Sequence, residues 1–235
     1  MKIPRIIHQI WSGIDEPLPK YFSVLGETWK NNHPAWEYMF WDEARINGFI
    51  QEYYPQYQTV YKDFKYNVQR WDVIRYLILE KIGGVYADFD YECISPLDEL
   101  LNDKSCCFAC EPSEYVKFFS KEVYFNNALM ASIPNHPFMK VIIEAVFKET
   151  YKEKVYPSKM IEVLETTGPL IITSLYEQYD AKESIYLIPE ELVSPFSKND
   201  VRMLMNKTIE KETEEYLEKK LEHAIAIHYF WGSWL

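Results

Sequence analysis

We predict an α/β fold in which helices pack against a mainly parallel sheet. Short apolar runs rich in β-branched and aromatic residues alternate along the chain with longer segments whose apolar residues recur at helical spacing. Of the 235 residues, 48% are hydrophobic, which is enough for one large domain with a sizeable core. We find no internal repeat, linker or low-complexity segment, so residues 1–235 are expected to form a single domain.

The N-terminal third of the chain contains start and stop signals for each element. The opening apolar run ends where Pro17 favours a loop, and Asp42 can cap the helix that follows an alternating, aromatic-rich run. The most apolar helical pattern ends at Gly83, as expected of a glycine after the last turn. The elements expected here are strands over 3–11 and 36–41 and helices over 19–32, 43–53 and 69–82.

Beyond Gly84 the chain restarts as a short strand over 85–87, which leads directly to two aspartates. The later segments alternate in the same way, and a tail that is first apolar and then aromatic closes the chain. The remaining expected elements are strands over 106–109, 125–131 and 185–188, and helices over 137–150, 158–166, 170–179 and 205–222.

The charge of the protein argues against a nucleic-acid partner. The formal net charge is −11, and the sequence has no stripe of lysine and arginine that would overcome the repulsion from a phosphate backbone. A nucleotide diphosphate is a different partner, because a divalent cation can bridge it to acidic residues.

Two features of the sequence bear on the environment of the protein. Cys106, Cys107 and Cys110 lie close enough for a metal site, but no second Cys/His pair is near and structural zinc takes four ligands. We interpret them as reduced cysteines packed in a strand. A charged-then-apolar leader and an apolar run of about 18 residues are both absent, so a cytoplasmic protein is expected.

Asp88 and Asp90 form the motif with the clearest chemistry. A lone Asp-x-Asp is weak evidence, but here an uncharged strand leads into it, and ligands bind at the carboxyl ends of parallel strands. In an extended chain, side chains two residues apart point to the same side, and a hard divalent cation relieves the repulsion between two such carboxylates. The alternative is a surface turn with two solvated aspartates.

Asp72 and Arg75 share one face of the predicted helix over 69–82, because they lie three residues apart. A surface ion pair would explain them equally well if the helix were exposed. The rest of the helix is unusually apolar, so we expect the pair to line a pocket. Arg75 is suited to binding phosphate or sugar hydroxyls, and Asp72 to accepting hydrogen bonds from sugar hydroxyls.

The two ends of the chain supply further candidates. His228 and Ser233 carry groups that can bind a divalent ion bearing phosphates, although a lone histidine is more often part of the core. Trp11 follows the first predicted strand and could stack on a base, or it could belong to the core.

Taken in order, these motifs resemble the family 32 glycosyltransferases. The span 70–90 is similar to the DXD-containing sugar-binding region of that family, which includes yeast initiating mannosyltransferases, α1,4-galactosyltransferases and capsule enzymes. Glucosylating clostridial toxins share the core. The other matching motifs are 3–11, Asn127-Ala128, His136-Pro137, Thr167-Gly168-Pro169 and the closing segment from His228 to Trp234.

The resemblance implies a GT-A fold, retention of anomeric configuration and Mn²⁺ or Mg²⁺ as cofactor. It implies that Asp90 binds the metal directly and that Asp88 contacts the donor or reaches the metal through water. The roles implied for the other residues are sugar binding by Asp72 and Arg75, base stacking by Trp11, closure over the diphosphate by Ser233 and Trp234, metal binding by His228, and a place near the anomeric centre for Asn127.

The function expected from these motifs is transfer of a hexose or N-acetylhexosamine from a nucleotide sugar to a glycan or lipid-linked saccharide. A UDP-sugar is favoured over GDP-mannose, and surface or capsular polysaccharide synthesis is the expected setting. The mixed basic and aromatic segment 117–121 suggests peripheral contact with the inner face of a membrane, or only an exposed turn. The alternatives are a metal-dependent phosphohydrolase or nucleotidyltransferase, and a non-catalytic glycan-binding protein.

Overall fold

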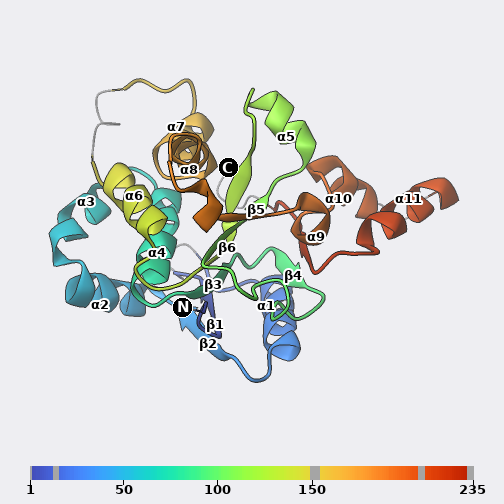
Figure 1. The fold of residues 1–235 in the computed structure, drawn as a ribbon, viewed down its shortest axis with the longest axis horizontal. Coiled ribbons are helices and arrows are strands. Elements are labelled where there is room, and N and C mark those ends of the chain that lie inside the picture. The colour runs from blue at the N-terminus through green and yellow to red at the C-terminus, as the bar shows by residue number, and fades with distance from the viewer. Residues whose placement is uncertain (1, 13–15, 149–153, 206–209, 232–235) are drawn as a thin grey trace.

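A computed structural model describes residues 2–12, 16–148, 154–205 and 210–231, and its centre is a six-stranded sheet (Figure 1). The strand order is β2-β1-β3-β6-β5-β7. Pairing is parallel except where β6 meets β3 and β5, so β6 alone runs against the others. The strand bounds are β1 Ile6–Ile10, β2 Glu37–Trp41, β3 Gly84–Ala87, β5 Cys106–Cys110, β6 Phe125–Ser132 and β7 Tyr186–Ile188.

A second, two-stranded sheet pairs the chain just after β3 with the C-terminal region. Its strands β4, Tyr91–Cys93, and β8, Ala226–His228, run antiparallel, with Tyr91 opposite His228. The helix bounds are α1 Lys20–Asn32, α2 Glu43–Tyr53, α3 Gln58–Asp63, α4 Asn67–Lys81, α5 Ser113–Phe118, α6 Pro137–Val146, α7 Lys159–Thr166, α8 Pro169–Glu177, α9 Glu190–Val193, α10 Lys198–Leu204 and α11 Lys211–Leu221.

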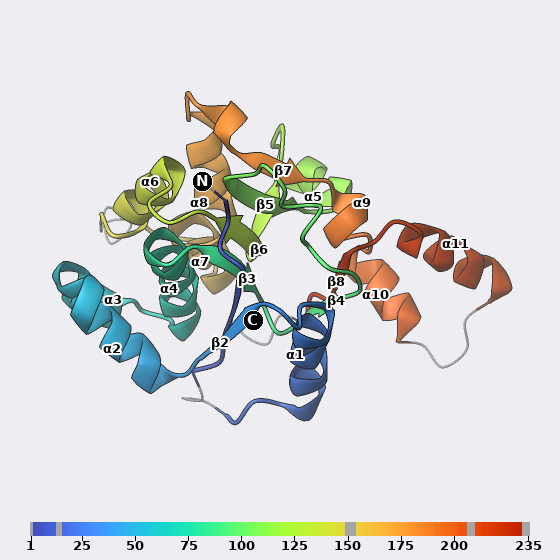
Figure 2. The same ribbon diagram turned by 60° about the horizontal axis from the view of Figure 1, so that its bottom comes forward.

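Helices cover both faces of the sheet, as an α/β layer structure requires. Tyr86 points to the face covered by α2, α4, α6 and α8, whereas Val85 and Ala87 point to the face covered by α1, α9 and the small sheet. Both ribbon views show these two groups on opposite sides, with α11 projecting at one end (Figures 1 and 2). None of the described helices is both long and apolar enough to cross a membrane.

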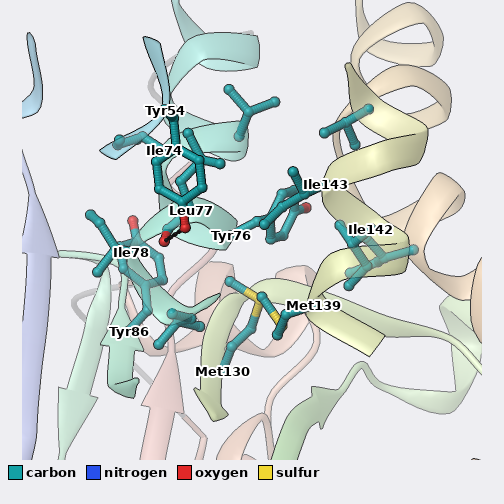
Figure 3. Packing of buried hydrophobic residues seen from close by; sticks show 14 of the residues in the cluster. Tyr54, Ile74, Tyr76, Leu77, Ile78, Tyr86, Met130, Met139, Ile142 and Ile143 are labelled. Atoms are coloured by element: carbon teal, nitrogen blue, oxygen red, sulfur yellow. Dashed lines mark hydrogen bonds between the residues drawn. The ribbon is translucent and has the colours of Figure 1, made fainter. Parts of the chain in front are cut away.

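Helix α4 lies at the centre of the larger core. Eleven of its fifteen residues are buried. Figure 3 shows its side chain Ile78 beside Tyr86 of the sheet, Ile74 and Leu77 near Tyr54, and Tyr76 toward α6. Burial on nearly all sides explains why the polar residues of this helix are surrounded by protein rather than water.

The predicted fold class is confirmed, and most predicted elements appear within a few residues of their expected bounds. Two helix ends differ from the prediction. Helix α6 stops at Val146 rather than at 150. The helix predicted over 205–222 is observed as α11, which begins at Lys211, and residues 206–209 lie outside the described part of the chain. The predicted cap is present, since the Asp42 side chain accepts a hydrogen bond from the Arg45 amide. Cys106 and Cys107 are free and buried in β5, which confirms the reading of packed thiols.

Of the helices and strands given above, sequence reasoning missed six short ones, namely α3, α5, α9, α10, β4 and β8. Each has seven residues or fewer. Elements of this length have too few residues to show a hydrophobic period, and packing against neighbours stabilises them.

The entry to β3 depends on two glycines and a buried histidine. Gly83 and Gly84 have φ values of 74° and 103°, a region that favours glycine. Trp41 Nε1 donates to His8 Nδ1 at 3.1 Å, so Nε2 carries the proton and donates to the Gly83 carbonyl at 2.8 Å. Burial lowers the pKa of His8 to about 4, which keeps the ring neutral.

We predict that Gly84→Ala lowers the free energy of unfolding by about 2 kcal/mol or more. The added Cβ would meet the Ile6 carbonyl oxygen at 2.7 Å, and the positive φ would be strained. Urea denaturation measures the loss. Gly48→Ala is the matched control, because a Cβ there meets nothing within 4 Å and lies on α2, where alanine is the better helix former. Equal stability of the two variants would contradict the prediction.

Candidate active site

A cavity of about 620 Å³ lies at the carboxyl-end edge of the sheet. The residues that follow β1, β3 and β5 all line it: Trp11, Asp88 and Glu111. Asn127 joins them because β6 runs in the opposite direction, so its start lies at this edge. This is where ligands bind in open α/β sheets.

Asp88 and Asp90 line the cavity together, but not because the chain is extended. The Tyr91 amide donates to the Asp88 carbonyl at 3.1 Å, so the motif is a tight turn. The expectation of an extended chain at this point is therefore wrong. The turn still directs both carboxylates into one cavity. The alternative of two solvated aspartates is excluded by burial: the side chains are only 27% and 13% exposed.

The two carboxylates differ in their surroundings. Burial raises the pKa of Asp88 to about 6 despite the nearby Arg75, and the Asp90 carboxylate contributes to the increase. Burial would also raise the pKa of Asp90, but His228 and the Trp231 amide outweigh it, so the pKa is lowered. The Trp231 amide donates to Asp90 Oδ2 at 3.0 Å. Asp90 is thus the better anionic ligand of the pair.

The chemistry of these donors fits a divalent cation that also binds substrate. Two carboxylates face one cavity, and repulsion between them is relieved by a cation. Within the described residues, no group of three or more His, Cys, Asp and Glu side chains is placed to hold an ion alone. Ions such as Mg²⁺ commonly bind through one or two carboxylates plus substrate phosphates. The DXD motif therefore implies metal dependence of this kind.

Arg75 links α4 to the aspartate turn. Its Nη2 lies 3.5 Å from Asp72 Oδ1 and its Nη1 3.3 Å from Asp88 Oδ2. Nη1 also donates to the Asn127 carbonyl at 3.0 Å, and the guanidinium lies over the Tyr86 ring. The pair Asp72 and Arg75 therefore lines a pocket, as the apolar helix predicted, rather than forming a surface ion pair.

Asp72 is held by neutral donors from two further elements. Asn127 Nδ2 donates to Oδ1 at 2.8 Å, and Thr167 Oγ1 donates to Oδ2 at 2.9 Å. Asn127 also donates to Tyr76 Oη at 2.9 Å. Each carboxylate oxygen keeps a second lone pair, so Asp72 can still accept from a sugar hydroxyl. The network fixes both side chains before any substrate binds.

His228 reaches the turn through the small sheet. Pairing of β8 with β4 places its Nε2 3.5 Å from Asp90 Oδ2. The ring stacks on Tyr91 at 4.3 Å between centroids and packs against Phe230 at 4.0 Å. The structure therefore brings His228 to the predicted metal ligand, although residues 91 and 228 are far apart in sequence. Its role as a ligand remains a prediction.

The remaining predicted donor contacts are partly described. Trp11 lines the cavity, its Nε1 donates to the Glu16 carbonyl at 2.8 Å, and its ring packs near Phe22 and Phe89. Base stacking by Trp11 remains a prediction. Ser233 and Trp234 lie outside the described residues.

Sequence reasoning missed two groups of cavity residues. Glu111 follows the carboxyl end of β5, so the rule that singled out Asp88 could have found it. Most of an apolar wall was not foreseen either, because its residues come from separate elements with no motif; only its Phe118 and Phe119 lie in the predicted contact segment 117–121. That wall consists of Val68, Trp71, Phe118, Phe119, Met160, Val163, Leu164 and Pro169.

Part of this site matches a known protein family. Residues 19–107 match the family described as "Glycosyltransferase sugar-binding region containing DXD motif". The match includes Asp72, Arg75, Asp88 and Asp90. Residues 19–107 are thus similar to the sugar-binding region of this family. The resemblance to family 32 glycosyltransferases is thereby confirmed.

Curated relatives are similar to the chain over a longer segment. Inositol phosphoceramide mannosyltransferase 1 of Schizosaccharomyces pombe is 30% identical over 76% of this chain and 52% of its own length. Inositol phosphoceramide mannosyltransferase 2 of the same yeast is 33% identical over 75% of this chain and 47% of its own length. The chain thus spans about half the length of the curated relatives it matches.

The fold is that of known glycosyltransferase domains. The UDP-bound glycosyltransferase domain from the YGT toxin superposes with a TM-score of 0.56, covering 94% of this chain and 89% of that domain at 10% identity. This likeness confirms the predicted GT-A fold.

We predict that Arg75→Met lowers the free energy of unfolding by about 3–5 kcal/mol, because it leaves Asp72 and Asp88 as unpaired buried charges. Adding Asp72→Asn should restore part of the loss. Arg5→Met is the control: the Arg5–Asp98 pair is shorter, at 2.7 Å, but exposed, so about 1 kcal/mol or less is expected. Denaturant unfolding of the three variants tests this, and similar losses in Arg75→Met and Arg5→Met would contradict it.

Proposed function

We propose that this chain transfers a hexose from a nucleotide sugar to a hydroxyl group of an acceptor that carries an apolar part. The observation that carries the proposal is the convergence of Asp88 and Asp90 with the Asp72–Arg75–Asn127 network in one cavity. The first group suits a cation and a diphosphate, and the second suits a sugar. The match of residues 19–107 to the DXD-containing family supports this proposal.

Asp90, with Asp88 and His228 and together with the diphosphate oxygens of the donor, would hold Mn²⁺ or Mg²⁺. When bound, the cation supplies charge neutralisation for the diphosphate leaving group. Arg75 adds a fixed positive charge 3.3 Å from Asp88, at the junction of the diphosphate and sugar regions. Its position is set by contacts with three elements, so it needs little reorganisation during reaction.

Asp72 and Asn127 orient the transferred sugar in this proposal. Asp72 is buried and hydrogen-bonded, so it is a fixed acceptor for sugar hydroxyls. Retention of configuration is carried over from the family resemblance. We propose attack on the same face from which the diphosphate leaves, with the leaving phosphate accepting the proton of the acceptor hydroxyl. A glycosyl-enzyme adduct trapped and seen by mass spectrometry would contradict this mechanism.

Mannose is the first sugar to test. The curated relatives with 30% and 33% identity are named mannosyltransferases. The sequence-based preference for a UDP-sugar is the competing expectation. The two expectations differ in both base and sugar, so a donor panel separates them.

The apolar wall of the cavity supports an acceptor with an apolar part. It lies on α4, α5, α7 and α8, where Phe118 is 72% exposed and Met160 is 36% exposed at the rim. A purely polar glycan would leave this surface without a matching partner. The same relatives are named for inositol phosphoceramide, a lipid. A lipid-linked acceptor is therefore favoured over a free glycan, and a role in capsule synthesis remains a prediction.

The segment 117–121 contributes to this rim in part. Phe118 is exposed, whereas Lys121 pairs with Glu177 at 2.7 Å on α8. The membrane contact proposed for this segment would therefore be made by its aromatic rings more than by its two lysines. Contact of this kind would bring the cavity mouth to the surface where a lipid-linked acceptor lies.

We predict that the purified protein releases nucleoside diphosphate from one nucleotide sugar, with GDP-mannose tested first and common UDP-sugars beside it. Release should require Mn²⁺ or Mg²⁺, stop with chelator and fall at least 100-fold in Asp90→Asn. Asp98→Asn, an exposed aspartate paired with Arg5, is the control. Metal-dependent cleavage of simple phosphate esters would favour a phosphohydrolase. Glycan binding without release would favour a non-catalytic protein.

We predict that the double variant Phe118→Ser and Met160→Ser raises KM about tenfold or more for an acceptor with an alkyl chain, since two apolar contacts are lost. KM for the same headgroup without the chain should change little. Val24→Ser, exposed on α1 and not part of the cavity wall, is the control. Equal changes for the two acceptors would rule out an apolar acceptor site.

A further inference from the structure

Two buried polar atoms on the cavity wall lack a hydrogen-bond partner among the described residues: Glu111 Oε2 and His228 Nδ1. Both residues are only 7% exposed. Their side chains face each other, with the second carboxylate oxygen, Glu111 Oε1, 3.9 Å from His228 Nδ1. Buried polar atoms are rarely left unpaired, so one on each of two facing side chains points to a shared role.

The contacts of the His228 ring fix the plane of the ring, but they do not distinguish its two orientations within that plane. Tyr91 stacks on one side at an interplanar angle of 8°, and Phe230 packs at 37°. Stacking is nearly the same if the ring turns by 180° about its bond to Cβ. That turn exchanges Nδ1 with a carbon atom and removes Nε2 from its place 3.5 Å from Asp90 Oδ2. A hydrogen-bond acceptor beside Nδ1 is needed to distinguish the two orientations.

Glu111 is the side chain placed to be that acceptor. Its amide donates to the Tyr124 carbonyl at 3.0 Å, directly after an irregularity in the β5–β6 register between Phe108 and Cys110. Such irregularities redirect the side chains that follow. A movement of about 1 Å by the carboxylate would bring it within hydrogen-bond distance of Nδ1.

The neighbouring polar groups are already engaged. Asn126 Oδ1 accepts from the Ala128 and Leu129 amides at 3.0 Å each, and its Nδ2 donates to Tyr91 Oη. Asp90 lies at the opposite edge of the His228 ring. Of the described groups around the ring, Glu111 is therefore the one that lies beside Nδ1 and keeps an unpartnered acceptor oxygen, Oε2.

We propose that Glu111 is a positioning residue that holds His228 with Nδ1–H toward its own carboxylate and the Nε2 lone pair toward Asp90 and the divalent cation. The proposal rests on the proposed function, because it assumes that a cation binds at Asp90. Residues that orient a metal-binding histidine commonly change metal affinity 10- to 100-fold when replaced. The Glu111 carboxylate would thus act on the ion through the histidine.

The first test measures Mn²⁺ binding by the electron paramagnetic resonance signal of free Mn²⁺, with UDP and with GDP present. Glu111→Leu should weaken binding about 10- to 100-fold. Glu111→Gln should bind more tightly than Glu111→Leu, because an amide oxygen can still accept from Nδ1–H. Glu114→Gln is the matched control: it removes the same charge from the same cavity wall, but Glu114 is exposed.

Three outcomes would overturn the proposal. Glu111→Leu could bind Mn²⁺ as tightly as the wild type. Glu111→Gln and Glu114→Gln could show the same loss as Glu111→Leu, which would mean that only the total charge matters. The wild type could fail to bind Mn²⁺ with either nucleotide.

The second test reads the tautomer directly. The five histidines are labelled with ¹⁵N, and the His228 signals are identified by their loss in His228→Gln. With Mg²⁺ and the nucleotide that supports binding, the wild type should show His228 protonated at Nδ1, and Glu111→Leu should show a mixture. If the signals of the other four histidines are retained in Glu111→Leu, that variant is folded. If Glu111→Leu does not fold, the same measurement is made on Glu111→Gln.

Protonation of His228 at Nε2 in the wild type would overturn the proposal. Neither test depends on turnover. A failed donor panel together with Glu111-dependent Mn²⁺ binding would therefore reject the transferase alone, whereas a successful panel with no effect of Glu111 would reject the positioning role alone.

Discussion

The buried guanidinium of Arg75 is the interaction on which the rest of the site depends. It lies between Asp72 and Asp88 and also donates to the Asn127 carbonyl, so it ties α4, the end of β3 and the start of β6 together. A charge removed from water is stable only if such partners surround it. Asp72 and Asp88 come from different elements, and this one side chain contacts both of them.

The reversed strand β6 is what gives the cavity its mixed composition. Strands β1, β3 and β5 end at the cavity edge with Trp11, the aspartate turn and Glu111, while β6 begins there and adds Asn127. Carboxylates therefore outnumber cationic groups at this edge. An excess of carboxylates is typical of a site that binds a divalent cation, and it agrees with a protein whose net charge is strongly negative.

The cavity joins two environments that suit two different substrates. Its polar part can hold a diphosphate and a sugar, and its apolar wall continues to the exposed rings and thioether at the rim. In the proposed function, this arrangement would bring a polar donor and an amphipathic acceptor into one space from which water is partly excluded.

The sequence by itself determined the α/β class, the main elements and the residues of the aspartate motif and of the Asp72–Arg75 pair. These depend on local signals, namely hydrophobic period, caps and the order of motifs along the chain. Only the tertiary structure decided that Asp88 and Asp90 lie in a turn, that His228 meets Asp90 through the β4–β8 pair, and that Glu111 faces His228. These facts come from strand pairing and packing between distant segments, which leave no period or spacing in the sequence. The apolar wall of the cavity was also decided only by the tertiary structure, because four helices contribute to it and none of them carries a sequence motif that would have indicated it.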